Sequence, residues 1–578
     1  MPKALLCLPP CYCYTYDFPP LGTPMLAGYL KSKNIDVLQA DYNMEYLHYW
    51  KRKIFNKSIP PVMSTNELAW ATSELLNKMF SLKHKKNYYY SPLLSDIDIH
   101  YADISNASFS FTERMLCAEY LFRYIEDEGE NTFLQFFKEQ NVLARLEREG
   151  VDVVGISIIA PSQTLAAFTL GYLIKKRLPH IHVTIGGQWV SLYREQLKQR
   201  RDWDRFFDSM IVFEGETPLY RLISALRGDG DLSKVPNLIY KSGSRWVDAG
   251  NTLREDLDKL AAPDFDGLPL RDYVTAQTTG KAPLTYQTAR ECYWNKCAYC
   301  VDLPLPKQGY RERDMELVID DIKQLTKKYG PLFLEISNAT LSAPQMKKLS
   351  ERILRENLDV SWWCFARPEG NFTKRIFALA KKAGCRTIAF GLESGNQRVL
   401  DFVKKGIVLD TARRVIVDCH DAGIDVNLQM MMGLPSETIQ EALDTVKFLI
   451  DNKEIIAAPT FNIYYVTPAC QVYLNPSQYH IRYKNYPETP FKFFHEFSHI
   501  TGEVSRDRAY AIINTYQRMI SRKKDNGPAT ASIEAAAAAK EYDLSLTIGK
   551  DTVSIKYPSG DIPREELAEN YSEAVEHA

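Results

Sequence analysis

The segment Arg290-Glu-Cys-Tyr-Trp-Asn-Lys-Cys-Ala-Tyr-Cys300 places Cys292, Cys297 and Cys300 on one short loop, with the spacing C-x4-C-x2-C. The loop directly follows the apolar segment 284–288, which predicts a β-strand. Iron–sulfur clusters are bound by cysteine thiolates, usually four. Three thiolates on one loop can hold three irons of a cubane and leave the fourth iron for a small molecule.

In radical chemistry that small molecule is S-adenosylmethionine, which chelates iron through its amino and carboxylate groups and releases a 5′-deoxyadenosyl radical on reduction. The alternative is structural zinc, which needs a fourth, closed ligand. The nearest histidines in sequence are His182 and His420. Cys364, Cys385 and Cys419 fall in segments that predict core strands or helices, so a [4Fe–4S] cluster is favoured.

The segments around and after the loop alternate between strand and helix patterns. Strands are predicted at 284–288, 332–336, 360–365, 387–390, 426–432 and 460–466. Helices are predicted at 317–329, 344–356, 372–383, 412–422 and 439–452. Six strands alternating with helices predict a (β/α)6 partial barrel, with its active site at the C-terminal strand ends.

Polar residues gather at those predicted strand ends. A carboxylate there can bind a ribose or an ammonium group, a cation can bind the aminoacyl carboxylate, and Met430–Met432 can form a flat apolar wall for adenine. Gly433 and Glu437 close the fifth predicted strand. The candidate residues for S-adenosylmethionine are Tyr299, Glu335, Asn338, Arg367, Glu393, Ser394, Gln429 and Met431.

The N-terminal part predicts a second α/β unit. Strands are expected at 4–8, 36–40, 151–159, 182–185 and 210–213, with helices between them. This alternation predicts a doubly wound, Rossmann-like parallel sheet, in which ligands bind outside the carboxyl ends of the strands. Adjacent glycines there allow a bulky ligand to approach the backbone. Alternatively, the sheet is only a scaffold and the glycines serve as turn residues.

The chain is long enough for several domains: 578 residues exceed the usual size of one hydrophobic core. We expect a Rossmann-like domain at 1–250 with a helical insertion at about 45–145, a linker at 251–274, a barrel at 275–470 and an α-rich region at 471–578. The insertion is interpreted as packing helices or as a lid over the ligand.

Composition narrows the function classes. The net charge of −1 gives no field that would attract nucleic acid or an anionic membrane. No apolar run approaches the ~18 residues needed to span a bilayer. Eleven cysteines without a secretion signal predict a cytoplasmic protein.

A rival motif lies near the C-terminus. His495-Glu-Phe-Ser-His499 satisfies H-E-x-x-H, which on a helix places two histidines for zinc and a glutamate as general base. No convincing third ligand follows the motif, so a metalloprotease is the less favoured interpretation. The same residues can line the substrate end of the barrel.

Three further motifs carry a family resemblance: Ala383-Gly-Cys-Arg-Thr-Ile-Ala-Phe-Gly-Leu-Glu-Ser394, Met432-Gly-Leu-Pro-Ser-Glu437 and Asp264-Phe-Asp-Gly-Leu-Pro269. Together with the cysteine loop they resemble the cobalamin-dependent radical S-adenosylmethionine enzymes, in particular peptide maturases and natural-product C-methyltransferases. The loop departs from the family in two ways: Asn295 replaces the usual glycine, and four residues separate the first two cysteines.

The resemblance implies that the N-terminal sheet binds cobalamin. The residues that it assigns to cobalamin are Pro20, Leu21, Gly22, Ser157, Ser162, Gln163, Gly186, Gly187, Gln188, Glu214, Gly215 and Glu216. The family's Asp-x-His-x-x-Gly motif is replaced by Pro9-Pro-Cys-Tyr-Cys-Tyr, which implies cobalt without a histidine lower ligand.

The resemblance also implies the reaction, which is C-methylation of an unactivated carbon in a peptide or natural-product substrate. One S-adenosylmethionine would methylate cobalamin and a second would supply the radical, with flavodoxin or ferredoxin as electron donor. Two alternatives stay open: a radical cyclase or ring-rearranging enzyme that uses cobalamin without methyl transfer, and a non-catalytic cobalamin- or cluster-binding sensor. The substrate cannot be identified from the sequence.

Overall fold

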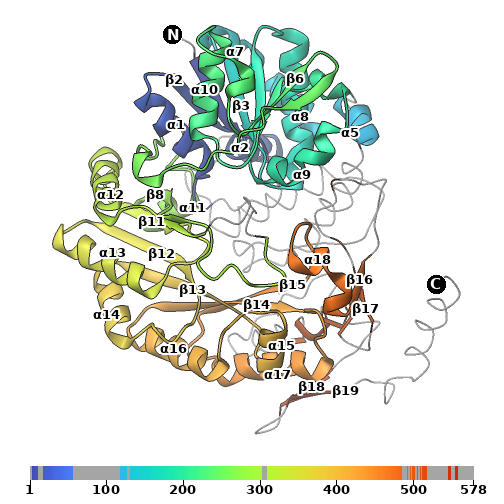
Figure 1. Cartoon of the computed structure of the whole chain (residues 1–578). Coiled ribbons are helices and arrows are strands. Elements are labelled where there is room, and N and C mark those ends of the chain that lie inside the picture. Colours follow the sequence, from blue (N-terminus) through green and yellow to red (C-terminus); the bar gives the residue numbers. More distant parts are fainter. Residues whose placement is uncertain are drawn as a thin grey trace, which may run out of the picture.

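The structure is a computed structural model that describes residues 3–10, 17–55, 118–126, 131–301 and 309–483, short runs between 491 and 516, and two strands near the C-terminus. Figure 1 shows two α/β units, an N-terminal sheet with its helices above and a curled sheet with its helices below. The part of the insertion interpreted as a possible lid, 56–117, lies outside the described residues.

The first sheet has seven strands in the order β2-β1-β3-β4-β5-β6-β7. Its strands are β1 (Lys3–Leu8), β2 (Asp36–Asp41), β3 (Val153–Ser157), β4 (His182–Gly186), β5 (Ser209–Ile211), β6 (Leu238–Ser242) and β7 (Arg245–Asp248). The five predicted strands are all present and pair in parallel. The structure adds an antiparallel hairpin, β6–β7, beside β5.

Helices cover both faces of this sheet (Figure 1), which explains why its parallel strands are continuous apolar runs. They are α1 (Gly22–Ser32), α2 (Tyr42–Phe55), α5 (Ala118–Ile125), α6 (Thr132–Glu139), α7 (Val142–Glu149), α8 (Thr164–Arg177), α9 (Gln188–Lys198) and α10 (Glu216–Leu226). Helix α8 has buried residues on every side between Thr164 and Ile174, because it packs under the sheet and against α5 and α6. The described part of the insertion, α2 and α5–α7, is helical as predicted.

The second sheet has six strands in the order β15-β14-β13-β12-β11-β8. They are β8 (Ala282–Tyr286), β11 (Leu332–Ile336), β12 (Val360–Ala366), β13 (Cys385–Glu393), β14 (Asp425–Met432) and β15 (Ala458–Ile463), and every neighbouring pair is parallel. The predicted partial barrel is therefore present as a curled half-barrel (Figure 1).

Helices cover the convex side of the half-barrel (Figure 1). They are α12 (Met315–Tyr329), α13 (Ala343–Arg355), α14 (Lys374–Lys382), α15 (Gln397–Phe402), α16 (Leu409–Asp421) and α17 (Ile439–Asp451). Asp314, Ser342, Thr373, Asn396 and Thr438 cap five of them by accepting backbone hydrogen bonds through their side chains. These caps fix where each helix begins, and so the length of the loop that leads into it from the strand end.

The two units meet through the segment after β1. Phe18 lies 5.8 Å from Phe333 of β11 and 6.3 Å from Trp363 of β12, ring centroid to ring centroid. The backbone oxygen of Pro19 accepts a hydrogen bond from Thr285 Oγ1 at 2.6 Å. Phe18 and Pro19 therefore lie against β8, β11 and β12 of the half-barrel. Between the units, 251–274 contains a short 3-10 turn (Leu257–Lys259), and α11 (Val274–Thr279) follows.

The C-terminal region differs from the α-rich expectation in its described residues. It contains α18 (Gln471–Leu474), helical positions between 508 and 516, and two antiparallel pairs, β16 (Ile481–Tyr483) with β17 (Phe497–His499) and β18 (Ser545–Ile548) with β19 (Val553–Lys556). Apolar residues in this region alternate too briefly for their period to separate strand from helix. None of the described helices is both long and apolar enough to cross a membrane.

Candidate active site around the cysteine loop

The cysteine loop starts at a small ribbon in which β9 (Ala289–Arg290) pairs with β10 (Arg311–Glu312). Left-handed backbone at Glu291 (φ 65°) and Asn295 (φ 43°) turns the chain around the loop. Asparagine tolerates this conformation better than most residues, which is consistent with Asn295 where the family has glycine.

None of the three cysteines is in a disulfide, and Cys300 is exposed while Cys292 and Cys297 are half-buried. Three thiols on one accessible loop are a donor set suited to an iron–sulfur cluster. The cysteines considered as a fourth zinc ligand lie elsewhere: Cys364, Cys385 and Cys419 are fully buried in the core of the half-barrel. Among the described residues, no three His, Cys, Asp or Glu side chains are gathered as a metal-binding group, so the assignment to a cluster rests on the spacing of the cysteines and the accessibility of their loop.

Arg367, which follows β12, stands directly behind the loop. Its Nη1 lies 3.9 Å from Cys297 Sγ, its Nε donates to Glu369 at 2.6 Å and its Nη2 donates to the backbone oxygen of Lys405 at 2.5 Å. The residue is 3% exposed. Arg367 thus places a buried positive charge beside one of the three sulfur atoms that would bind iron.

Glu393 ends β13 in a left-handed conformation (φ 75°) and is buried. Its Oε1 accepts a hydrogen bond from Lys405 Nζ at 2.8 Å, and the same ammonium group is 3.1 Å from Tyr299 Oη. Glu393 does not cap the following helix, because Asn396 caps α15 and Ser394 Oγ accepts from Asn396 N. The carboxylate is instead part of a buried ion pair next to the cysteine loop.

Two other candidates for S-adenosylmethionine stabilise loops. Asn338 Oδ1 accepts from the backbone nitrogens of Thr288 and Ala289, at 2.9 and 3.2 Å, and so holds the chain that leads into the cysteine loop. Ser394 Oγ lies 3.2 Å from Thr445 Oγ1 on α17. Both side chains are buried, so their hydrogen bonds shape the site.

The remaining candidates lie on the half-barrel strands. Gln429 and Met431 are half-buried on β14, and Met431 packs against the apolar cluster that contains Tyr299 and Tyr464. Glu335 is half-buried on β11, and burial together with the nearby charge of Asp17 raises its pKa to about 7. Burial also raises the pKa of Asp17 to about 6.

Glu437 shapes the end of β14. Its Oε2 accepts hydrogen bonds from Gly433 N at 2.6 Å and Leu434 N at 3.3 Å, while its Oε1 has no partner among the described residues. The side chain is fully buried, and burial raises its pKa to about 8 despite these two hydrogen bonds. The carboxyl group therefore carries a proton near neutral pH.

At the N-terminal sheet, the residues assigned to cobalamin fall into two groups. Ser157, Gly186 and Gly187 lie at the carboxyl ends of β3 and β4, as expected, and Gly22, which Pro20 and Leu21 precede at the start of α1, lies beside Ser157. Ser162 is buried in the turn before α8, and Gln188 begins α9. Gln163, in contrast, is fully buried and braces its own loop: its Oε1 accepts from Ile159 N and Ala160 N, and its Nε2 donates to Pro9 O.

Glu214 and Glu216, which flank Gly215 after β5, form ion pairs that reach the cysteine loop. Glu214 Oε1 is 2.8 Å from Arg290 Nη1 and 2.5 Å from Arg311 Nη2, and Arg290 also pairs with Glu216. Burial alone would raise the pKa of Glu214, but Arg311 and Arg290 hold it below its usual value. The carboxyl end of β5 is therefore joined to the residues directly before Cys292.

Three functional side chains were missed by the sequence analysis: Asp17, Lys405 and Arg311. Lys405 is followed by Gly406 and stands 12 residues after Glu393, close enough in sequence to give a local signal. Arg311 stands in a stretch of sequence without helix or strand periodicity and had no such signal. Its role depends on Glu214, which lies 97 residues away.

The H-E-x-x-H motif does not form a zinc-binding helix. His495 pairs through its backbone with Val466, and His499 is in β17, opposite Ile481. In an extended chain, residues four apart are separated by about 13 Å, too far to share one zinc ion. His499 Nε2 instead lies 3.2 Å from Val504 O, and Glu496 lies outside the described residues. The metalloprotease interpretation is wrong.

Comparisons with known proteins agree with this arrangement. The radical SAM superfamily model matches residues 286–449. An uncharacterised methyltransferase of Pyrococcus horikoshii is 28% identical over 300 residues, which cover 51% of this chain and 63% of the relative. An anaerobic magnesium-protoporphyrin IX monomethyl ester cyclase of Rubrivivax gelatinosus is 26% identical over 54% of this chain and 56% of the relative.

The chain thus spans between half and two thirds of the length of these relatives. Among solved structures, the cobalamin-dependent S-adenosylmethionine radical enzyme OxsB, with aqua-cobalamin and S-adenosylmethionine bound, aligns with a TM-score of 0.57 at 13% identity. The alignment covers 91% of this chain and 69% of that one, so the likeness in fold includes both sheets. The radical SAM superfamily model therefore matches the half-barrel and the cysteine loop of this chain, and proteins similar to the chain include an uncharacterised methyltransferase.

Proposed function

We propose that this protein is a cobalamin-dependent radical S-adenosylmethionine methyltransferase that acts on an unactivated carbon of a peptide or natural product. The observation that carries the proposal is the contact of Arg290, directly before the cysteine loop, with Glu214 and Glu216 at the carboxyl end of β5. It brings the edge of the sheet where a bulky cofactor would bind against the loop that would hold the cluster.

The cluster and S-adenosylmethionine would each be bound by a separate set of residues. Cys292, Cys297 and Cys300 would hold a [4Fe–4S] cluster, which supplies the electron that cleaves S-adenosylmethionine. Arg367, Glu393 and Lys405 lie beside the same loop, where Lys405 donates hydrogen bonds to Glu393 and to Tyr299. A charged carboxylate can accept hydrogen bonds from the ribose or ammonium group of S-adenosylmethionine.

The carboxyl ends of β1, β3 and β4 suit a bulky ligand. Helix α1 begins at Gly22, and the buried Thr23 Oγ1 in its first turn has no partner among the described residues. The described histidines of this unit are elsewhere: His48 pairs with Asp272, and His180 and His182 lie at the amino end of β4. This supports cobalamin, a methyl-group carrier, bound without a histidine lower ligand.

A first experiment tests the cluster. The protein is reconstituted anaerobically with iron and sulfide and its metals are measured. We expect about four irons per chain and a broad band near ~400 nm, both lost when the three cysteines are changed together to alanine. Zinc in place of iron, or full iron and sulfide in the triple variant, would refute the assignment.

A second experiment tests the reaction. Reconstituted protein with cobalamin, a reductant and S-adenosylmethionine bearing a deuterated methyl group should form S-adenosylhomocysteine and 5′-deoxyadenosine, even slowly without the true substrate. If 5′-deoxyadenosine forms but S-adenosylhomocysteine does not, the cyclase-type reaction is favoured, as in the relative from Rubrivivax gelatinosus. If neither product forms with both cofactors loaded, the proposed function fails.

The localisation and partners belong to the same proposal. The enzyme would work in the cytoplasm, where a flavodoxin or ferredoxin supplies electrons. Cleavage of each S-adenosylmethionine to a radical consumes one electron from outside the chain. A docking site for such a carrier is therefore a requirement of the proposed function.

A further inference from the structure

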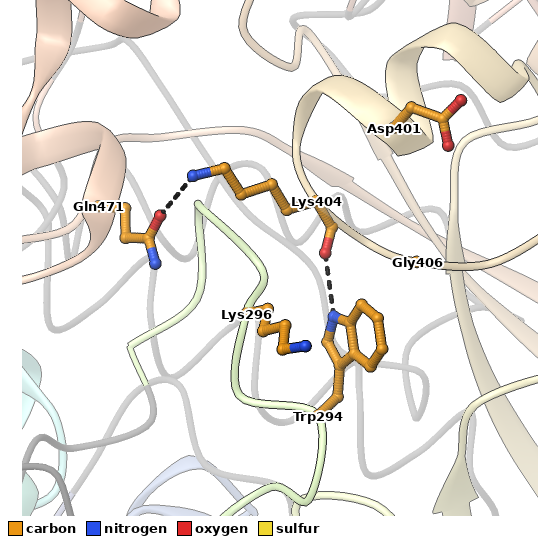
Figure 2. A pocket seen from close by; sticks show the side chains of 6 residues that line it. All are labelled: Trp294, Lys296, Asp401, Lys404, Gly406 and Gln471. Atoms are coloured by element: carbon orange, nitrogen blue, oxygen red, sulfur yellow. Dashed lines mark hydrogen bonds between the residues drawn. The ribbon is translucent and has the colours of Figure 1, made fainter.

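A surface pocket of about 420 Å³ opens beside the cysteine loop. It is lined by Trp294, Lys296, Asp401, Lys404, Gly406 and Gln471. Figure 2 shows Trp294 and Lys296, both from the cysteine loop, facing the segment that follows α15 and the start of α18. Lys296 directly precedes Cys297 in the chain, so the wall of the pocket is the cluster loop itself.

The indole of Trp294 is held rigidly in this wall. Its Nε1 donates a hydrogen bond to Lys404 O at 2.9 Å, which Figure 2 draws as a dashed line. Gly406 lies against the edge of the ring, where a Cβ would come within 2.0 Å of Trp294 Cζ2. Position 406 also has a positive φ of 68°, so glycine is required there for two separate reasons.

A continuous chain of contacts leads from the pocket to a cysteine sulfur. The Arg367 guanidinium carbon lies 4.7 Å from the centroid of the Trp294 ring, and Arg367 Nη1 lies 3.9 Å from Cys297 Sγ. Two side chains therefore separate the pocket surface from a residue that would bind the cluster. Among the pockets of the described chain, this one has the cysteine loop as its wall.

The pocket is positively charged. Lys296 and Lys404 are both exposed, and neither forms an ion pair with any described residue. Lys296 Nζ lies 4.8 Å from the Trp294 ring centroid, and Lys404 Nζ donates to the neutral Gln471 at 3.1 Å. The acidic lining residue, Asp401, accepts from Gln397 at 2.9 Å, and Figure 2 shows its carboxylate turned away from both lysines.

We propose that this pocket is the docking site for an acidic one-electron carrier protein of the flavodoxin class. The inference rests on the proposed function, which requires an external electron. Two ammonium groups without ion pairs, beside a half-buried indole, suit a negatively charged surface that carries an aromatic redox group at its centre. One electron leaves the reduced flavin and enters the bound cluster, and no bond forms between the two proteins.

The test uses the reconstituted enzyme with Lys296→Glu and Lys404→Glu combined. The matched control combines Lys348→Glu and Lys382→Glu, which make the same change in net charge. Both control lysines are exposed and lie on α13 and α14, at the left of Figure 1, whereas α15 and α18 lie at the right. None of the four lysines belongs to the proposed cofactor sites.

The first measurement is binding of oxidised flavodoxin, by calorimetry at low and at high salt, to enzyme with and without its cluster. We expect the pocket variant to bind at least about tenfold more weakly at low salt, with a smaller dependence on salt, whereas the control variant stays close to wild type. Equal binding by the pocket variant and wild type would overturn the proposal, whatever the activity of the enzyme.

The second measurement compares two reductants. With reduced flavodoxin, formation of 5′-deoxyadenosine by the pocket variant should fall by about the same tenfold factor as its binding. With titanium(III) citrate, a small chemical reductant, it should match wild type. If the variant fails with both reductants while flavodoxin binding is unchanged, the two lysines act in a step other than docking and the proposal is overturned. If wild type fails with both reductants, the proposed function fails, and the binding measurement still decides the docking site.

Discussion

Lys405 and Glu393 form a buried pair whose members depend on each other. Lys405 Nζ is 2.8 Å from Glu393 Oε1, and both side chains are at most 10% exposed. Removing one partner of such a pair leaves an uncompensated charge away from water. We expect Glu393→Gln to lower the free energy of unfolding by ~3 kcal/mol and to weaken S-adenosylmethionine binding by about 10- to 100-fold.

The control is Lys405→Met alone and combined with Glu393→Gln. The double variant should be less destabilised than the sum of the two single variants, because neither charge is then left unpaired. Denaturant unfolding gives the stabilities, and equilibrium titration gives the affinity. Additive losses of stability, or unchanged ligand affinity in Glu393→Gln, would contradict the role given to the pair.

Glu437 gives the protein a pH-dependent stability. Its pKa is about 8 in the folded state, against an ordinary value of 4.5, so the folded state binds more protons between these two values. The stability that this carboxyl group contributes should therefore be fully present below about pH 4.5. It should be lost as the pH rises towards 8, by at most ~1.4 kcal/mol per pH unit for this one proton. Glu437→Gln keeps an acceptor for Gly433 N and cannot ionise, so the decline should become shallower by that amount.

Denaturant unfolding of wild type and Glu437→Gln at several pH values measures this difference. Glu441→Gln is a suitable comparison, because burial tends to raise the pKa of Glu441 but Arg398 and Thr438 lower it overall. A lowered pKa predicts the opposite sign, with stability lost as pH falls. Parallel stability curves for wild type and Glu437→Gln would show that Glu437 is ionised throughout.

At the scale of elements, two glycines near the strand ends of the N-terminal sheet differ in role. One is needed for the backbone to fold, and the other leaves room for a ligand. A Cβ on Gly187 would meet Ile158 O at 2.5 Å, and its φ of 101° is unfavourable for other residues. A Cβ on Gly22 would meet Ser157 Oγ at an ordinary 3.7 Å, at the exposed start of α1.

We therefore expect Gly187→Ala to lower the free energy of unfolding by ~2 kcal/mol or more. Gly22→Ala should leave it within about 0.5 kcal/mol of wild type but weaken cobalamin binding, because the new methyl group stands where the cofactor would approach. Denaturant unfolding and equilibrium titration with cobalamin distinguish the two. Normal cobalamin affinity in Gly22→Ala would remove Gly22 from the proposed site.

At the scale of the whole molecule, buried charges join the two units at the cysteine loop. Arg290 pairs with Glu214 and Glu216, and Arg311 pairs with Glu214 and with Glu291, at 2.6 Å in the last case. These side chains are between 4% and 17% exposed, so salt screens them poorly. The network fixes the residues directly before Cys292 relative to the end of β5.

Arg290→Gln removes a cation from two buried carboxylates. We therefore expect it to lower the free energy of unfolding by ~3 kcal/mol, with little dependence on salt. We also expect a lower iron content after reconstitution. Asp359→Asn is the control, since it breaks an exposed pair with Lys281 and should change stability by at most ~0.5 kcal/mol. Denaturant unfolding at two salt concentrations and iron analysis provide the measurements. Equal small effects of the two substitutions would argue against a structural link between the units.

The sequence by itself determined the elements and the cysteine loop. Strand β11 was predicted at 332–336, where it lies, and its alternate apolar residues Leu332, Leu334 and Ile336 are fully buried in the core. The cysteine spacing indicated its chemistry because all three thiols lie on one loop, so no distant part of the fold is needed to bring them together.

Only the tertiary structure decided which side chains meet across the molecule. The sequence analysis assigned Glu214 and Glu216 to a ligand. In the structure they pair with Arg290, 76 and 74 residues away, because the carboxyl end of β5 packs against the start of the cysteine loop. The H-E-x-x-H spacing is compatible with a helix or with a strand. The pairing of β17 with β16 shows that His499 lies in a strand. Local patterns record burial and backbone preference, whereas ion pairs and strand pairing between distant segments depend on how those segments pack.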